Sequence, residues 1–319
     1  MERKKVLGLS FGRKLGNTEI MVKTALMECE KAGCDVKFIR VDAMNIKPCT
    51  GCMSCLVGMT TGKGKGGCPV KDEFHVLDEA LMECDAVIVG SPTYMLSPTG
   101  RFKTVCDRIG LSHDITFRKA AYEEGVATGR SAEQLPDPRS FKKRVGALIA
   151  VGGAMTKNRL SLMLPTMYEF TMPMGIDVID AHESFGAMAH EHILGNRAEL
   201  ERSSEIGQNI AAALCAESEE ERVKWCGEEE GVCPVCHCNL LTVSEDRRVV
   251  ECPVCGIEGK LEIADGKITA KFTEEQQKRS RLHWEGMLEQ FNQVNISAVG
   301  PGQIPNLKEL MEPFKGYAE

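Results

Sequence analysis

The sequence has no long apolar run and no surplus of basic residues. No segment reaches the roughly 18 to 20 apolar residues that a membrane-spanning helix needs. The chain starts with MERKKVLGLSFG, whose apolar stretch is short for a secretory signal. We therefore expect a cytoplasmic protein that does not bind membranes. Lysine and arginine total 39 against 46 acidic residues, a net charge of −7, so nucleic acid is not an expected partner.

Cysteine, in contrast, is abundant. The 319 residues include 15 cysteines, and many of them stand in two clusters. Disulfide frameworks are typical of small secreted domains, and this chain lacks the features of a small secreted domain. Clustered cysteines in a chain of this kind predict metal binding.

Short β-branched runs alternate with longer helical stretches from residue 4 to about 214. This alternation is typical of βαβ units, and mostly continuous apolar strands are typical of a sheet covered on both faces. We therefore predict an α/β fold with a doubly wound, five-stranded parallel sheet. The predicted strands are 5–9, 35–41, 86–90, 145–151 and 177–179. The predicted helices are 17–32, 73–84, 100–109, 160–171 and 196–225.

Two polar inserts, 56–67 and 112–143, interrupt the alternation and are predicted to be loops or lids. We divide the chain into a first domain at 1–225, a small cysteine-rich metal ribbon at 226–272, and a C-terminal helix and tail at 273–319. The ribbon is expected to contain a strand pair around a turn at 264–266.

The final helix is predicted to begin near Thr273. Thr273 and Gln276 have the spacing of a capping box, in which each side chain bonds to the other residue's backbone.

The loop after the first predicted strand runs directly into a helix. Free backbone N–H groups and the helix dipole then converge on one point, which suits a phosphate monoester. An ordinary polar turn with an N-cap is the alternative. The candidate ligand residues are Ser10, Arg13, Lys14, Gly16, Asn17 and Thr18.

A second candidate loop follows the third predicted strand, at the switch point of the sheet where ligands of open α/β folds bind. A planar ring could lie against this loop, with space left by two glycines after the fourth strand. A simple packing role for Tyr94 is the alternative. The candidate residues are Ser91, Pro92, Thr93, Tyr94, Gly152 and Gly153.

The phosphate loop ending in Gly16-Asn17-Thr18, the loop Gly90–Tyr94 and the pair Asp107-Arg108 resemble the NADPH-dependent FMN reductase superfamily. The resemblance covers about residues 4–214. It implies a flavodoxin-like fold, FMN with its phosphate in the first loop, and one-electron or two-electron flavin chemistry. The chain departs from the family pattern by placing Phe11-Gly12 before Arg13.

The first cysteine cluster contains Cys49, Cys52 and Cys55 at C-x2-C-x2-C spacing, with Cys68 as the expected fourth ligand. Soft thiolates at this spacing favour an iron-sulfur cluster. A zinc site or free buried thiols are the alternatives. The motif resembles that of the iron-sulfur flavoproteins of anaerobes, which implies a 4Fe-4S cluster, and a homo-oligomer in which this cluster lies near an FMN. The insert 56–67 lengthens the loop relative to those proteins.

The second cluster consists of two C-x2-C knuckles separated by fifteen residues. The spacing of Cys233, Cys236, Cys252 and Cys255 is typical of a four-cysteine zinc ribbon. A single rubredoxin-type iron is the alternative metal. His237 and two spare thiols, Cys226 and Cys238, adjoin the knuckles.

Three histidines, His182, His190 and His192, are predicted to lie in the connection after the fifth strand, at the edge of the sheet where chemistry is expected. His190 and His192 are the candidates for supplying protons to an acceptor. Polar loop histidines without a catalytic role are the alternative.

These features predict an oxidoreductase in which ferredoxin or NAD(P)H supplies electrons through a 4Fe-4S cluster and FMN to a small acceptor. One alternative is an NAD(P)H-dependent quinone, azo or flavin reductase whose cysteines are structural. Another is a redox-sensing binding protein that uses its zinc ribbon to contact a partner.

Overall fold

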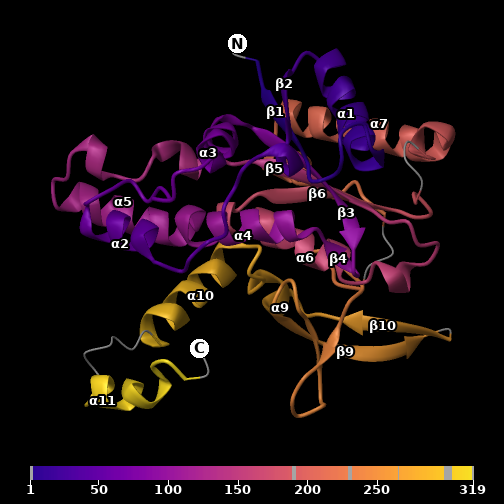
Figure 1. Ribbon diagram of the computed structural model, residues 1–319. Coiled ribbons are helices and arrows are strands. Elements are labelled where there is room, and N and C mark those ends of the chain that lie inside the picture. Colours follow the sequence, from indigo (N-terminus) through magenta and orange to yellow (C-terminus); the bar gives the residue numbers. More distant parts are fainter. Residues whose placement is uncertain (1–2, 189–191, 229–231, 265, 298–303, 318–319) are drawn as a thin grey trace.

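The computed structural model describes residues 3–188, 192–228, 232–264, 266–297 and 304–317, and shows an α/β domain joined to a smaller antiparallel sheet (Figure 1). The parallel sheet has the order β2-β1-β3-β5-β6, and the two-residue β4 (Ser97–Pro98) pairs antiparallel with β3. This is the flavodoxin-like order, with a switch point between β1 and β3. The predicted fold class is confirmed. The parallel strands are β1 (Lys5–Ser10), β2 (Asp35–Arg40), β3 (Ala86–Tyr94), β5 (Val145–Val151) and β6 (Asp177–Ser184).

Helices cover both faces of this sheet, as its apolar strands require. Helix α1 (Asn17–Lys31) and helix α7 (Arg197–Cys215) contact each other on one face. The other face carries α3 (Phe74–Glu83), α4 (Gly100–His113) and α6 (Met163–Thr171). Every residue of β5 is buried, which explains why its bounds were predicted correctly from its apolar sequence alone.

Strand β6 is longer than predicted and extends to Ser184. Its polar residues are paired with helix α7, because the carboxylate of Asp180 accepts bonds from Arg202 and Asn209. His182 lies 2.7 Å from the Glu199 carboxylate through Nε2. The prediction that His182 belongs to the connection after the strand is therefore wrong.

Both predicted loops contain helices. Helix α2 (Ser54–Thr61) lies in the first insert and α5 (Ile115–Ala127) in the second. They are stabilised by a small hydrophobic cluster that includes Met59, Phe117 and Ala121. The long helix predicted at 196–225 ends earlier, at Cys215, and is followed by the short α8 (Glu219–Arg222).

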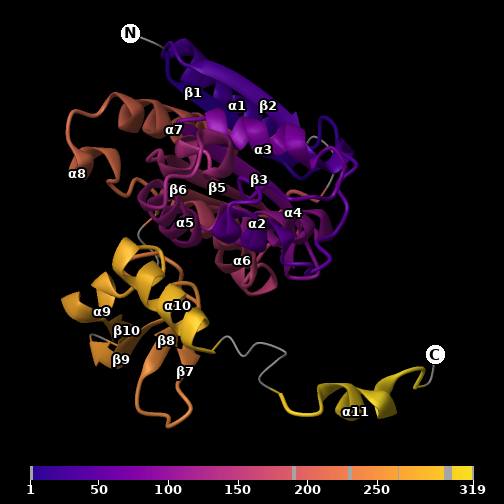
Figure 2. The same cartoon turned by 90° about the vertical axis from the view of Figure 1, so that its left-hand side faces the viewer.

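The smaller sheet is antiparallel, with the order β10-β9-β8-β7. In Figure 2 it lies below the α/β domain, beside the first two helices that follow it in the chain, whereas the last helix lies apart. Its strands are β7 (Thr242–Val243), β8 (Val250–Cys252), β9 (Ile257–Ala264) and β10 (Lys267–Lys271). The helices after it are α9 (Glu274–Lys278), α10 (Trp284–Ser297) and α11 (Leu307–Met311).

The expected capping box at Thr273 forms only in part. Thr273 Oγ1 accepts a hydrogen bond from the Gln276 amide. The Gln276 side chain instead accepts from the backbone N–H of Glu258 on β9, so it ties α9 to the sheet.

The two parts of the protein share hydrophobic packing. One cluster of buried side chains includes Phe170 of α6 together with Cys236 and Phe272 of the smaller part. None of the helices in the described ranges is long and apolar enough to cross a bilayer.

Candidate functional site

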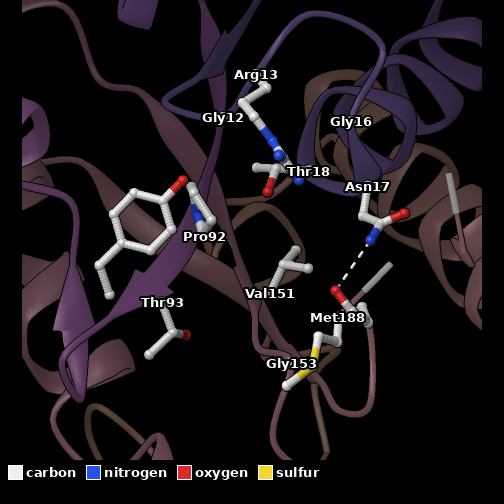
Figure 3. A pocket seen from close by; sticks show the side chains of 12 residues that line it. Gly12, Arg13, Gly16, Asn17, Thr18, Pro92, Thr93, Val151, Gly153 and Met188 are labelled. Atoms are coloured by element: carbon white, nitrogen blue, oxygen red, sulfur yellow. Dashed lines mark hydrogen bonds between the residues drawn. The ribbon is translucent and has the colours of Figure 1, made fainter. Parts of the chain in front are cut away.

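A cavity of about 250 Å³ lies at the carboxyl ends of β1, β3 and β5 (Figure 3). This is the switch point of the sheet, where β1 and β3 run side by side and their connections diverge. The cavity is lined by Gly12, Arg13, Gly16, Asn17, Thr18, Pro92, Thr93, Tyr94, Val151, Gly153, Ala187 and Met188.

The phosphate-loop end of the cavity is suited to an anion. Gly16 is the N-cap of α1 and has no side chain with which to cap the helix, so backbone N–H groups of the first turn face the cavity. A Cβ on Gly12 would stand 2.9 Å from the Thr18 Cβ, so only glycine lets the loop approach the helix this closely. Arg13 supplies a positive charge at the same end.

The other end contains an unsatisfied polar atom. Thr93 Oγ1 is buried and has no hydrogen-bond partner in the described part of the chain. A buried hydroxyl without a partner is costly, so the site has a hydrogen-bonding group ready for a ligand. Pro92 and Tyr94 flank it, and Gly153 stands opposite, against Met188.

Asn17 closes the cavity on the β6 side. Its Nδ2 donates to the Ala187 oxygen at 3.0 Å (Figure 3), and its Oδ1 accepts from the Ile193 amide at 3.1 Å. The side chain thus fixes the segment after β6 against the phosphate loop.

Gly12, Val151, Ala187 and Met188 line the cavity but were not among the predicted site residues. For Ala187 and Met188 the reason is that β6 was predicted to end too early. The small and apolar residues that follow Ser184 in the sequence could have indicated that this segment lines the cavity.

Four of the predicted cofactor-binding residues do not line the cavity: Ser10, Lys14, Ser91 and Gly152. Ser10 Oγ accepts from the Gly12 amide at 3.2 Å, and Ser91 Oγ accepts from the Thr99 amide at 3.4 Å. A side chain at Gly152 would clash with Leu160. Three of them therefore shape the loops around the cavity, while Lys14 is exposed.

Two apolar side chains that line the cavity, Tyr94 and Met188, are largely exposed, and further exposed methionines lie near them in the chain or against Gly186. Tyr94 is 56% exposed, Met155 80% and Met188 77%, and Met95 is almost fully exposed. Met95 and Leu96 have positive φ angles of 49° and 73°, which form the tight turn between β3 and β4. Exposed apolar side chains therefore adjoin part of the opening.

The first cysteine cluster lies on the loop after β2. Cys49 and Cys52 are exposed, whereas Cys55 and Cys68 are half-buried. Burial raises the pKa of Cys55, and the electrostatic influence of Cys68 and Cys49 raises it further. Gly51, with φ of 66°, donates its N–H to Cys49 Sγ at 3.4 Å.

The pKa of Cys52 is shifted in the opposite direction to that of Cys55. Hydrogen bonds from the side chain and amide of Ser54 and from the side chain of Thr50 lower the pKa of Cys52. A thiol held in this way favours the thiolate, which is the form that binds metal.

The first cluster is not among the compact ligand groups found in the described residues. Within the described ranges, one set of three or more cysteine, histidine or acidic residues has its ligand atoms close enough together to hold a single ion. That set is the four cysteines of the C-terminal part. In a 4Fe-4S cubane each thiolate binds a different iron, so four ligands stand farther apart. Four cysteine thiols, two exposed and two half-buried, are the kind of donor set that such a cluster uses, and the 4Fe-4S assignment stays a prediction.

The second cluster forms a compact site. Cys233, Cys236, Cys252 and Cys255 are all buried, and their sulfurs lie within 4.8 Å of one another. Sγ of Cys233 is 3.7 Å from that of Cys255, and Sγ of Cys236 is 3.4 Å from that of Cys252. Metal–sulfur bonds of 2.3 Å in a tetrahedron place sulfurs about 3.8 Å apart. The predicted four-cysteine site is confirmed.

The two knuckles have matching backbones. The His237 amide donates to the Cys233 oxygen at 3.0 Å, and the Gly256 amide to the Cys252 oxygen at 2.7 Å. Both residues have positive φ, 57° and 70°. His237 therefore occupies a glycine-like position, and its ring stacks on Trp225 with centroids 4.0 Å apart.

The histidines after β6 are only partly described. His190 lies outside the described residues. His192 begins a short 3-10 helix, His192–Gly195, and its side chain is also outside the description. Their proposed catalytic role stays a prediction.

Comparison with known proteins agrees with this geometry. The NADPH-dependent FMN reductase family profile matches residues 5–174. A flavone synthase of Aspergillus candidus is 29% identical over 264 residues, covering 81% of this chain and 78% of that protein. An iron-sulfur flavoprotein of Methanocaldococcus jannaschii is 30% identical over 166 residues, 52% of this chain and 70% of that protein.

Similarity of structure extends over both parts of the chain. A flavone reductase superposes with a TM-score of 0.79 at 24% sequence identity, covering 98% of this chain and 97% of that one. This likeness shows a common fold that includes the C-terminal sheet. With its flavodoxin-like sheet, its cavity at the switch point and a family match over more than half of its length, the chain belongs to the NADPH-dependent FMN reductase family.

Proposed function

We propose that this protein is an FMN-dependent oxidoreductase that transfers electrons to a small, planar and largely apolar acceptor. The observation that carries the proposal is the cavity at the switch point. At one end it has a helix N-terminus with glycine as its N-cap, and at the other the Thr93 hydroxyl, which has no partner among the described residues. Such a cavity suits a ligand with an anionic tail and a planar, polar-edged ring.

Different residues of the cavity would bind different parts of FMN. The N-terminus of α1, with Gly12, Arg13 and Thr18, would hold the phosphate. Pro92, Thr93 and Tyr94 would bind the ring, and the Thr93 hydroxyl would hydrogen-bond to its polar edge. Bound there, FMN supplies one-electron or two-electron transfer chemistry.

Cys49, Cys52, Cys55 and Cys68 would hold a 4Fe-4S cluster that accepts electrons from ferredoxin or NAD(P)H. Support comes from the spacing of the cysteines in the sequence, from the N–H···S and O–H···S contacts around Cys49 and Cys52, and from the similarity to iron-sulfur flavoproteins. We propose zinc for the C-terminal four-cysteine site, where it would stabilise the folded state of the small sheet.

The acceptor is proposed from the rim. Tyr94 and Met188 line the cavity and are largely exposed. Exposed Met95 follows Tyr94 in the chain, and exposed Met155 lies against Gly186. These apolar side chains would bind a flat aromatic molecule by removing its surface from water. The names of the flavone synthase and of the flavone reductase give this class of acceptor additional support. We propose a flavone-like compound as the first to test.

A second function is favoured by the same relatives. The chain could reduce its acceptor with NAD(P)H directly at FMN, with the first cysteine cluster serving only structure. The match to the flavone synthase over 81% of the chain, against 52% or less for the iron-sulfur flavoproteins, is the observation in its favour.

Anaerobic rapid-mixing kinetics separate the two functions. Reduced ferredoxin, NADH and NADPH are mixed in turn with the purified protein, and flavin absorbance is followed with and without a flavone. For the leading proposal, the Cys52→Ser variant should lose flavin reduction by ferredoxin or NAD(P)H, while Cys226→Ser should not. Equal rates of reduction in wild-type and Cys52→Ser protein would establish the direct reductase.

A further inference from the structure

Arg108 of α4 makes a direct contact with the cysteine cluster. Its Nε lies 3.2 Å from Sγ of Cys68, at hydrogen-bonding distance for a sulfur acceptor. Arg108 is only 2% exposed. A buried, permanently charged donor is therefore directed at the sulfur of the proposed fourth cluster ligand.

A carboxylate fixes the orientation of this guanidinium. Nη1 lies 2.6 Å from one oxygen of Asp72 and Nη2 lies 3.2 Å from the other, and both side chains are fully buried. Burial opposes ionisation of Asp72, but hydrogen bonds from Arg108 and from the Lys47 and Phe74 amides lower its pKa to about 2. The pair is thus a two-pronged ion pair, and Nε remains available for sulfur.

The same guanidinium joins the two ends of the cysteine loop. Nη1 also donates to the Lys47 oxygen at 2.9 Å, two residues before Cys49, and Nη2 to the Val70 oxygen at 3.4 Å, two residues after Cys68. The long gap between the third and fourth cysteines, which the sequence left unexplained, is therefore anchored at its base by one buried side chain.

We propose that Arg108 is a positioning residue for the iron-sulfur centre, which presents Cys68 Sγ as the fourth ligand and raises the midpoint potential of the cluster. This inference rests on the proposed 4Fe-4S cluster. Reduction adds one electron to the cluster and increases its negative charge. A buried cation that donates N–H to a ligand sulfur stabilises the reduced form more than the oxidised form.

Arg108→Lys tests the inference, because lysine keeps the charge beside Asp72 but lacks the Nε–H directed at sulfur. Arg101→Lys is the matched control. Arg101 is on the same helix and donates to the Ile46 oxygen at 2.7 Å, close to the same loop, without a recorded contact to a cysteine. Iron, sulfide and thermal stability are measured first, and the cluster potential is then determined by an anaerobic redox titration followed by EPR.

The expected result is a more negative cluster potential in Arg108→Lys and an unchanged potential in Arg101→Lys. A second measurement needs no variant. Wild-type protein labelled with 15N-arginine is reduced, and pulsed EPR should detect coupling between the cluster and an arginine nitrogen. Absence of this coupling overturns the inference, and so does an unchanged potential in folded, cluster-containing Arg108→Lys protein.

These outcomes are distinct from failure of the proposed cluster. If the wild-type protein contains iron and sulfide but shows no arginine coupling, the proposed cluster is supported and the proposed role of Arg108 is wrong. If anaerobically prepared and reconstituted wild-type protein contains neither iron nor sulfide, the proposed cluster and the proposed role of Arg108 are both wrong.

Discussion

Tyr168 on α6 donates a 2.7 Å hydrogen bond from its hydroxyl to the main-chain oxygen of Cys236, in the first knuckle of the C-terminal metal site. Tyr168 is 2% exposed, so the bond is shielded from water. It directly connects the flavin-binding α/β domain with the four-cysteine site.

Tyr168→Phe should reduce the free energy of unfolding by about 1 to 3 kcal/mol, because the Cys236 oxygen loses its buried donor. Chemical denaturation followed by circular dichroism measures the change. Tyr317→Phe, at an exposed tyrosine, is the control and should change little. Equal stability of the Tyr168 variant and wild type would show that the bond does not help to dock the two parts.

Cys252→Ser should abolish metal binding in the C-terminal site and unfold the ribbon, because it removes one of four converging ligands and metal binding contributes directly to the folding of such sites. Elemental analysis and limited proteolysis within 226–272 check this. Cys226→Ser, which alters an exposed thiol outside the group, should retain the metal. Full metal content in the Cys252 variant would contradict the assignment.

Thr93→Val should weaken FMN binding about tenfold, the equivalent of one lost hydrogen bond of about 1.4 kcal/mol. The flavin-free protein should be no less stable than wild type, because its buried hydroxyl has no partner in the described residues. Fluorescence titration with FMN and thermal unfolding provide the two readings. Thr104→Val, on the outer part of α4, is the control. Unchanged FMN affinity would remove Thr93 from the site.

His113 predicts a dependence of stability on pH. Burial lowers the pKa of His113 despite its 2.7 Å contact with the Asp78 carboxylate. The unfolded chain then binds a proton more readily than the folded one, so stability is greatest above the unfolded value of about 6.5 and falls as the pH decreases below it.

His113→Gln should remove part of this dependence. Denaturation of wild type and variant at pH values between about 5 and 7.5 measures the difference. Each of the other histidines is present in both proteins, so the comparison isolates His113. Parallel stability curves for the two proteins would show that His113 is not buried in its neutral form.

The sequence predicted the order of alternating strands and helices well where burial is complete. Strand β5 is an unbroken apolar run and was predicted to the residue. Strand β6 was not, because Asp180 and His182 read as loop residues, whereas α7 supplies partners for both. Such pairing depends on distant residues and leaves no local pattern.

Helix α2 was missed for a related reason. Its sequence, SCLVGMTT, contains weak helix formers, and the burial of Met59 against Phe117 of α5 stabilises it. The metal knuckles, in contrast, depend on short-range spacing and were predicted fully. The contact between Arg108 and Cys68 joins residues forty positions apart, and only the fold reveals it.

The most direct test of the account is the metal and flavin content of the anaerobically purified chain. We predict about four iron atoms and four sulfides, with one zinc and one FMN per chain, and a Cys68→Ser variant that loses iron and sulfide but keeps zinc and FMN. A wild-type protein that binds FMN but takes up no iron, even after reconstitution, would contradict the central claim.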